Sequence, residues 1–187
     1  MTRHSSDAVS AVETKRGDLT DAGFLANAFA GHDAVISALG FRLPGIAPWH
    51  KPKDPAFLET SARAVINACK QSGIQRVMAI SAGGVAESDT LMPAVFRMFI
   101  AMSALRHVYP HLAEMEQIYL TSGVADVCVA RPSGLTDGER TGKVHVVTRR
   151  MQGRAAISRA DVASWMLDQL DLSPQGARAP VITVTGL

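Results

Sequence analysis

Several side chains that could take part in chemistry stand where apolar runs of the sequence end. Asp18 and Gly40 each follow one such run, Ser81 closes another, and Pro132 and Ser133 follow a fourth. In open α/β sheets, ligands bind outside the carboxyl ends of the parallel strands. If the four runs are parallel strands, these five residues meet at one edge of the sheet and could hold a ligand there.

Other reactive side chains do not form a recognisable site. His107 and His111 are four residues apart, but Pro110 lies between them, and we interpret both as surface histidines rather than metal ligands. Cys69 and Cys128 lie inside separate apolar stretches, which indicates two buried thiols and no disulfide framework. We therefore expect no metal site.

The composition is that of one globular domain over residues 1–187. Apolar residues make up 47% of the chain and charged residues 19%, which excludes a disordered chain. The net charge of +2 is spread along the sequence and gives no reason to expect a nucleic-acid partner. No apolar run approaches the roughly 20 residues that span a bilayer, and the first residues lack the apolar core of a signal peptide. We expect a cytoplasmic protein that binds neither nucleic acid nor membrane.

Apolar runs alternate with helical patterns, and this alternation predicts an α/β fold with a parallel sheet. The segment 41–55 holds four prolines and a tryptophan, and we interpret it as a loop at the mouth of a site. The expected strands are Val12–Arg16, Asp33–Leu39, Arg76–Ser81, Asp126–Ala130, Lys143–Thr148 and Val181–Thr185. The expected helices are Asp21–Ala30, Pro55–Ser72, Pro93–Tyr109, His111–Ser122 and Ser158–Leu170.

Four passages together resemble the NmrA-like, flavin-reductase (biliverdin reductase)-like branch of the short-chain dehydrogenase superfamily. The last two are the most specific, because they contain RPSGLTDG and ISRADVASWM in the family's order and spacing. The resemblance extends from Arg3 to about Thr185 and implies an NAD(P)-binding, doubly wound Rossmann-like domain. The four passages are Gly17–Leu19 with Asp33–Ser37, Ser61–Ser81, Glu116–Gly138 and Ile157–Leu170.

The resemblance implies a role for the residues at the first three strand ends. Asp18 would accept a hydrogen bond from the adenine amino group, although an aspartate that only initiates a helix is the alternative. Leu39 and Gly40 would let the backbone approach ribose and phosphate, a use that a tight turn at the glycine also permits. The Ser81 hydroxyl would lie near the nicotinamide, as a catalytic and cofactor-binding candidate.

The resemblance also assigns residues after the fourth strand and near the N-terminus. The backbone of Pro132 and Ser133 would contact the nicotinamide carboxamide, and Ser133 stands where some relatives carry a histidine, as a second catalytic candidate. Arg131 joins this cofactor site or instead pairs with a carboxylate. Arg3 would face the 2′-phosphate of NADP, which favours NADP over NAD because a guanidinium matches phosphate geometry. A frayed terminus is the alternative at Arg3.

One part of the family pattern is missing from the sequence. No glycine precedes Gly17, so the glycine-rich loop that places a pyrophosphate at a helix N-terminus is absent. In the strand order 3-2-1-4-5-6, the chain would lack strands 1 and 2 and the first helix, which form the centre of the sheet. We expect an N-terminally truncated domain with open strand edges, whose natural sequence begins upstream. If the short form is real, we expect a rearranged sheet, or a second copy or partner chain that covers the missing centre.

The residues permit more than one function. An NAD(P)H-dependent reductase of a flavin, quinone or similar planar acceptor is the first hypothesis. The Tyr-x-x-x-Lys pair of typical short-chain dehydrogenases is missing, because Ala113 follows Tyr109 and Gly123 follows Tyr119 at that spacing. A non-catalytic dinucleotide-sensing or interaction module of the NmrA type is the second hypothesis, and a truncated inactive form is the third.

Overall fold

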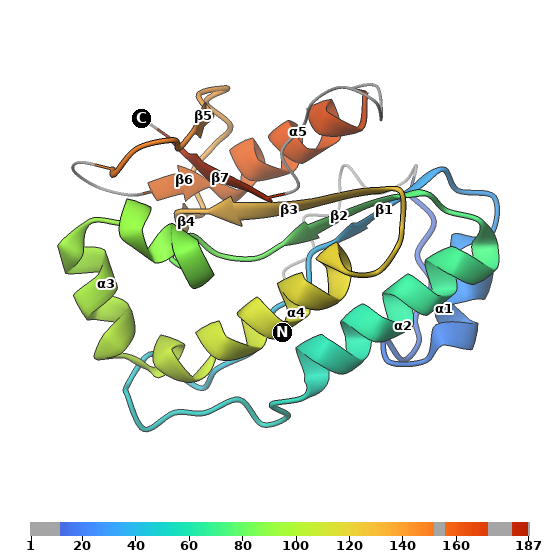
Figure 1. Cartoon of the computed structure of the whole chain (residues 1–187), viewed down its shortest axis with the longest axis horizontal. Coiled ribbons are helices and arrows are strands. Elements are labelled where there is room, and N and C mark those ends of the chain that lie inside the picture. The colour runs from blue at the N-terminus through green and yellow to red at the C-terminus, as the bar shows by residue number, and fades with distance from the viewer. Residues whose placement is uncertain (1–11, 152–155, 172–180, 187) are drawn as a thin grey trace.

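The fold is a mixed α/β arrangement around one mainly parallel sheet (Figure 1). The computed structural model describes residues 12–151, 156–171 and 181–186. The main sheet has the strand order β1-β2-β3-β7-β5, and only β5 runs antiparallel to its neighbour. Its strands are β1 (Ala34–Ser37), β2 (Arg76–Ile80), β3 (Asp126–Pro132), β7 (Val181–Thr185) and β5 (His145–Val146). The prediction of a parallel α/β fold is confirmed.

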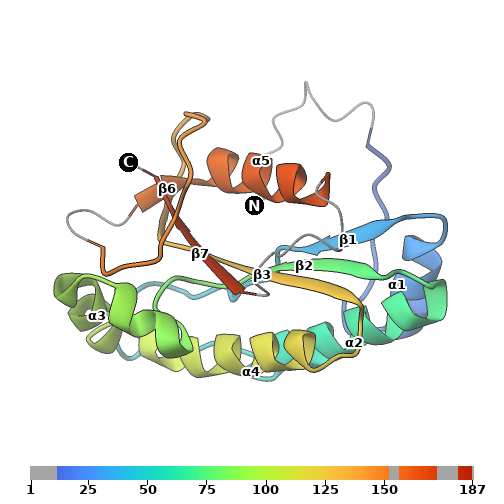
Figure 2. The same ribbon diagram turned by 45° about the horizontal axis from the view of Figure 1, so that its top comes forward.

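Helices cover both faces of the sheet (Figure 2). On one face lie α1, α2 and α4, and on the other lies α5. A small second sheet pairs β4 with β6 in parallel. The bounds of these elements are α1 (Ala22–Phe29), α2 (Phe57–Ser72), α4 (Tyr109–Leu120), α5 (Arg159–Leu170), β4 (Gly134–Thr136) and β6 (Ala156–Ser158).

The alternation of side chains along the strands creates a core on each face. Val77 and Val129 point into the larger core under α1, α2 and α4, whereas Met78 and Cys128 point into the core under α5. A strand covered on both faces has no polar side, which is why these runs read as continuously apolar. Cys69 and Cys128 are both buried and free, as expected, and burial raises the pKa of the Cys69 thiol to about 11.

Local sequence signals fix the ends of two helices. Gly73 ends α2 in the left-handed conformation with a φ of 73°, which a glycine adopts without steric cost, and its N–H donates to the carbonyl of Cys69. The Ser158 hydroxyl caps α5 by accepting from the N–H of Asp161. Burial would raise the pKa of Asp161, but bonds from Ser158, Gly142 and Thr141 lower it to about 2. The Asp161 carboxylate therefore ties the segment before β5 to the start of α5.

Two expected elements are shorter than predicted. The helix expected over Pro93–Tyr109 is divided into α3 (Ala94–Ala101) and a 3₁₀ turn, η2 (Ala104–His107), because the Ser103 hydroxyl donates to the Ile100 carbonyl and accepts from the N–H of Leu105. The strand expected over Lys143–Thr148 is only His145–Val146, where it pairs with the end of β7. A 3₁₀ turn, η1 (Ala86–Leu91), precedes α3.

The prediction of a strand over Val12–Arg16 is wrong. This segment contains no strand, because no neighbouring strand in the described parts of the chain pairs with it. Among those same residues β1 pairs only with β2, and it forms one edge of the sheet. Ile36 on β1 is 37% exposed, so the apolar side of this edge is incompletely covered.

No helix within the described ranges combines the length and the hydrophobicity needed to cross a bilayer.

Candidate functional site

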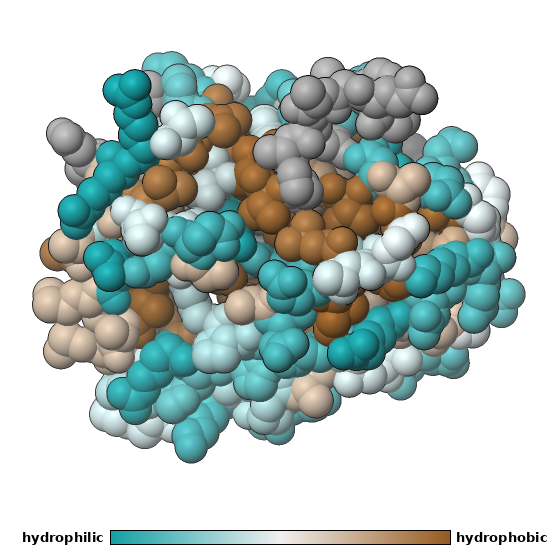
Figure 3. Space-filling view, viewed as in Figure 1, coloured by the Kyte–Doolittle hydropathy of each residue, from teal (hydrophilic) through white to brown (hydrophobic). Residues whose placement is uncertain are grey.

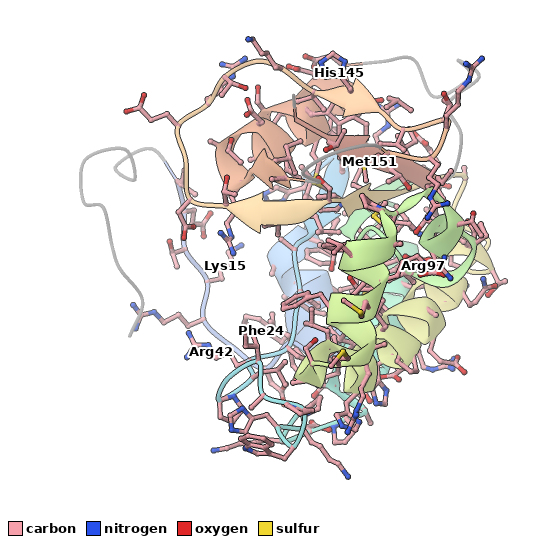
Figure 4. The ribbon with its side chains drawn as sticks, turned by 90° about the vertical axis from the view of Figure 1, so that its left-hand side faces the viewer. Lys15, Phe24, Arg42, Arg97, His145 and Met151 are labelled. Atoms are coloured by element: carbon pink, nitrogen blue, oxygen red, sulfur yellow. The ribbon has the colours of Figure 1, made fainter. Side chains whose placement is uncertain are left out.

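The ends of β1, β2 and β3 lie side by side and bring most of the predicted site residues to one edge of the sheet. Ser37 pairs in register with Ala79 of β2, and Ile80 pairs with Ala130 of β3. The chain therefore leaves the three strands at neighbouring points, followed in turn by Leu39–Gly40, by Ser81 and by Ser133. Figure 4 views the molecule from this side.

Ser81 is held at the end of β2 with its hydroxyl unused. Its N–H donates to the carbonyl of Ala130 over 2.8 Å, which continues the pairing with β3 beyond the strand. The residue is only 7% exposed, and its buried Oγ has no hydrogen-bond partner among the residues that the structure describes. Buried hydroxyls are normally satisfied, so this oxygen is available to a ligand or an ordered water.

Two glycines after Ser81 allow the chain to turn close to β3. The N–H of Gly83 donates to the carbonyl of Pro132 over 2.7 Å, and a Cβ at Gly83 would lie 3.1 Å from that same oxygen. Gly84 has a φ of 92°, and its N–H donates to the Ser88 hydroxyl. The Tyr109 hydroxyl donates to the carbonyl of Gly83 over 3.0 Å, and burial raises the pKa of Tyr109 well above its usual value. The turn beside Ser81 is therefore fixed from two sides.

The hydroxyl at the end of β3 has a hydrogen-bond partner, unlike the Ser81 hydroxyl at the end of β2. The N–H of Ser133 donates to the carbonyl of Val184, and the Ser133 hydroxyl donates to the Thr185 hydroxyl over 2.9 Å. Ser133 is 3% exposed. Its side chain is thus used to join β3 to β7, and a catalytic role of this hydroxyl stays a prediction with a competing structural use.

Arg131 shows the ion pairing that the sequence left open. Its Nε donates to Glu116 over 2.9 Å and its Nη2 donates to the same carboxylate, while Nη1 donates to Glu87 over 2.6 Å. Arg131 and Glu116 are 3% and 1% exposed, respectively. The guanidinium is therefore occupied, and any contact of Arg131 with a cofactor would have to use its backbone.

A pocket of about 440 Å³ opens beside the end of β1, and both Leu39 and Gly40 line it. Their role in cofactor binding stays a prediction. A Cβ at Gly40 would meet no atom within 4 Å, so the glycine faces open space rather than a crowded turn. The remaining lining residues are Leu19, Ala38, Phe41, Arg42, Lys53, Asp54 and Phe57. Arg42 and Lys53 were not predicted as site residues, although their segment was predicted to be a loop at the mouth of a site.

Asp18 lies next to this pocket through its neighbour Leu19, but its carboxylate also has a local role. Its Oδ1 accepts from the N–H and the hydroxyl of Thr20, both over 2.8 Å, and these two bonds lower the pKa of Asp18. Both bonds fall on one oxygen, so Oδ2 can still accept from an adenine amino group. Arg3 lies outside the described residues.

The Tyr119 hydroxyl was not identified from the sequence as part of the site. It donates to the Ser37 hydroxyl at the end of β1 over 2.9 Å, and both residues are buried. In the sequence, Tyr119 was considered only as part of a Tyr-x-x-x-Lys pair. That local pattern gives no information about a contact with Ser37, which lies 82 positions earlier in the chain. Tyr119 positions the end of β1, from which Leu39 and Gly40 follow.

A larger pocket lies at the opposite edge of the sheet. It measures about 630 Å³ and is lined by residues at the amino ends of the strands, including Ala34, Arg76 and Asp126. Ligands of this fold class bind at the carboxyl ends. We therefore assign the candidate site to the pocket beside Gly40 and the adjoining turns after β2 and β3, despite its smaller volume.

Comparison with known proteins identifies the family and the fold of the chain. The model of an NAD(P)H-binding family matches residues 2–172. A search of curated proteins finds no match. Among solved structures, the anaerobilin reductase ChuY of Escherichia coli O157:H7 is 22% identical, with a TM-score of 0.69 over 91% of this chain and 73% of that one. A short-chain dehydrogenase/reductase of Veillonella parvula in complex with NADP is 14% identical, with a TM-score of 0.69 over 90% and 70% of the two chains.

A further solved structure has the same fold. The oxidoreductase ylbE of Lactococcus lactis is 18% identical, with a TM-score of 0.69 over 95% of this chain and 73% of that one. The structural similarity to these proteins establishes the Rossmann-like fold, and the family model covers most of the sequence. The chain therefore belongs to the NAD(P)H-binding family.

Proposed function

We propose that the protein binds NADPH at the carboxyl ends of β1, β2 and β3 and reduces a flavin, a quinone or a similar planar acceptor. The observation that carries the proposal is the buried Ser81 hydroxyl beside the glycine turn after β2, which has no partner among the described residues. A hydroxyl without a partner at this edge fits a polar ligand group such as the nicotinamide carboxamide. The relatives named ChuY and ylbE are reductases or oxidoreductases, which supports the same class of reaction.

The described residues could contact the adenine and a phosphate of a dinucleotide, but they offer no glycine-rich turn for the pyrophosphate. The pocket beside Gly40 has apolar walls for an adenine, and Arg42 and Lys53 add positive charge for phosphate. Asp18 would accept from the adenine amino group through its Oδ2. The described ranges contain no glycine-rich turn that could hold the pyrophosphate. The start of α1 is capped by the carboxylate of Asp21, which occupies the place where an anion would bind. Arg3 remains the proposed ligand of the 2′-phosphate.

The protein's own groups would act by holding donor and acceptor close together. NADPH supplies the hydride, and Ser81 would orient the nicotinamide, with the backbone of Pro132 and Ser133 on its other side. Close positioning alone can lower the barrier by several kcal/mol. We assign no general acid, because the Ser133 hydroxyl donates to Thr185 and the Tyr109 hydroxyl donates to Gly83.

Blocking the pocket tests the proposal without disturbing the core. A leucine at Gly40 would enter open space, so Gly40→Leu should fold normally and weaken NADPH binding more than tenfold in calorimetry. Gly138→Leu is the matched control, because Gly138 is exposed and its only neighbour within 4 Å is the Thr136 hydroxyl at 3.7 Å. Acceptor reduction would then be followed as loss of NADPH absorbance with FMN and with a short-chain quinone.

The outcomes separate the hypotheses. NADPH binding with turnover supports a reductase, and tighter binding of NADPH than of NADH supports the proposed cofactor choice. Binding without turnover of any acceptor would favour the dinucleotide-sensing alternative, which the engaged Ser133 hydroxyl and the missing Tyr-x-x-x-Lys pair already support. If the wild-type chain binds neither nucleotide, the proposal is wrong.

A further inference from the structure

The helix α3 exposes an apolar face. Val95, Met98, Phe99 and Met102 follow one another at helical spacing, and each is between 45% and 72% exposed. The opposite face of the helix buries Ile100, so the exposed face is not the one that anchors α3 to the fold. Figure 3 shows hydrophobic residues at the left-hand end of the molecule, where Figure 1 places α3. Contiguous exposed apolar surface of this kind marks an interaction site.

A loop extends the same surface. In the segment 41–55, Ile46 is 63% exposed and Trp49 is 75% exposed. The loop is tied to the turn after α3, because the N–H of Ala104 donates to the Ile46 carbonyl over 2.9 Å. Arg106 also donates to the carbonyl of Pro48. We call the six exposed residues the apolar rim: Ile46, Trp49, Val95, Met98, Phe99 and Met102.

Positive charge accompanies the apolar rim. Arg42, Lys51, Lys53 and Arg106 form no ion pair with any described residue, and Asp54 is the one acidic residue of the loop. Of the acidic groups next to α3, Asp89 is neutralised by Arg97 over 2.7 Å, whereas Glu87 shares Arg131 with the buried Glu116. Figure 4 shows α3 crossing the front of the molecule with the loop below it. The surface is thus apolar with a cationic border.

We propose that the apolar rim docks on the surface of a lipid bilayer that carries anionic headgroups. Tryptophan is favoured at the boundary between headgroups and acyl chains, and lysine and arginine beside it are attracted to anionic lipid. A second copy of the chain fits less well, because a twofold contact would place the unpaired cations of both copies together. The sequence-based expectation of no membrane partner rested on the lack of a membrane-spanning segment. Docking on the surface of a bilayer requires no such segment. This docking does not depend on the proposed function.

Co-sedimentation of the full chain with vesicles tests the proposal. We expect binding to vesicles of phosphatidylcholine and phosphatidylglycerol, weaker binding to phosphatidylcholine alone, and loss of binding at high salt. Phe99→Ser should weaken binding about tenfold, since it removes a large apolar group. Leu167→Ser is its control, because Leu167 is 58% exposed but lies on α5. Lys51→Glu should weaken binding at least fivefold, from about 1 kcal/mol per cation, whereas Lys70→Glu on α2 should not.

Trp49 provides a direct reporter of docking. The chain has two tryptophans, so Trp165→Phe leaves Trp49 alone. Its emission should shift to the blue when anionic vesicles are added, and brominated lipids should quench it. Absence of sedimentation and of the shift would overturn the proposal. So would a dimer in light scattering that Phe99→Ser abolishes, because the rim would then be a contact between copies. Nucleotide titrations of the same variants show separately whether the cofactor site is intact.

Discussion

The ends of β2 and β3 are adjacent in the sheet but are built in opposite ways. At the end of β3, the buried Arg131 is paired with Glu116, and the Ser133 hydroxyl donates to Thr185. At the end of β2, the Ser81 hydroxyl is equally buried and has no partner among the described residues. One strand end is completed by the protein itself, and the other leaves a polar group for something that is not part of the chain.

The difference shows which end is structural and which is open to a ligand. A satisfied buried network contributes rigidity and is costly to break, because removing one partner leaves the other desolvated. A buried hydroxyl without a partner contributes nothing to folding and has a cost of its own. Substitutions at the end of β3 should therefore change the stability strongly, and substitution of Ser81 should change it little. For the affinity for a ligand we expect the opposite order.

Removal of Glu116 should have the largest effect on stability. Glu116→Ala leaves Arg131 buried with only the contact to Glu87, and breaking a buried pair in this way costs about 3–5 kcal/mol. Chemical denaturation measures the loss. Glu87→Ala is the control: Glu87 has a side chain that is 74% exposed, and its loss should cost less than about 1 kcal/mol. Equal losses in the two variants would mean that the end of β3 is not anchored by Glu116.

A side chain at Gly84 should disturb the turn after β2. The φ of 92° strains any other residue, and a Cβ would lie 3.2 Å from Ile100 and 3.3 Å from Met92. Gly84→Ala should therefore destabilise the fold by about 1–3 kcal/mol, as seen in a lower thermal midpoint. Gly40→Ala, at a site with open space, serves for comparison and should fold as the wild type does. If both variants fold equally well, the turn is not constrained as described.

Tyr119→Phe should have a moderate effect. It removes the hydrogen bond to Ser37 and leaves that buried hydroxyl unpaired, at a cost of about 1 kcal/mol. Burial raises the pKa of Tyr119 from 10.0 to about 12. A raised folded-state pKa contributes stability that is complete below pH 10 and is lost as the pH rises toward 12. Denaturation in alkaline buffers should show this loss, and it should be smaller in Tyr119→Phe.

Ser81→Ala should have the smallest effect on stability and a clear effect on the ligand. The free energy of unfolding should stay the same or rise by up to about 1 kcal/mol, because no hydrogen bond to a described residue is lost and the cost of the buried hydroxyl is removed. Ser133→Ala breaks the bond to Thr185 and should cost about 1 kcal/mol. Calorimetric titration with NADPH should show weaker binding for Ser81→Ala than for Ser133→Ala. The reverse order would indicate that the ligand uses the end of β3 and not that of β2.

Much of the fold could be predicted from local patterns, and the failures have identifiable causes. The strands Arg76–Ile80 and Asp126–Pro132 were found because runs buried on both faces have no polar alternation. The prediction failed at Val12–Arg16, because a strand requires a neighbour and no local pattern can report its absence. The helix from Pro93 was predicted too long, because Ser103 in a sequence of good helix formers gives no warning that its hydroxyl will replace backbone bonds.

The sequence predicted which strand ends are neighbours in the sheet, and less well which contacts their residues make. The strand-end rule placed Leu39, Gly40 and Ser81 together, and the register of β1 and β2 bears this out. Which hydroxyls are free was beyond the sequence, because Ser81 and Ser133 follow similar strands with similar neighbours. Only the position of Thr185, 52 residues further along the chain, distinguishes them.

By itself, the sequence determined the alternation of strands and helices, the glycine that ends α2 and the family to which the chain belongs, because these depend on residues close together in the chain. The tertiary structure alone decided that Arg131 is paired and that the Ser81 hydroxyl finds no partner in the part of the chain that the structure describes. It also decided that β1 lies at an edge and that the apolar residues of α3 face outward beside Trp49. Each of these depends on contacts between distant segments, and the number of polar partners or covering side chains at a point is set only when those segments pack together.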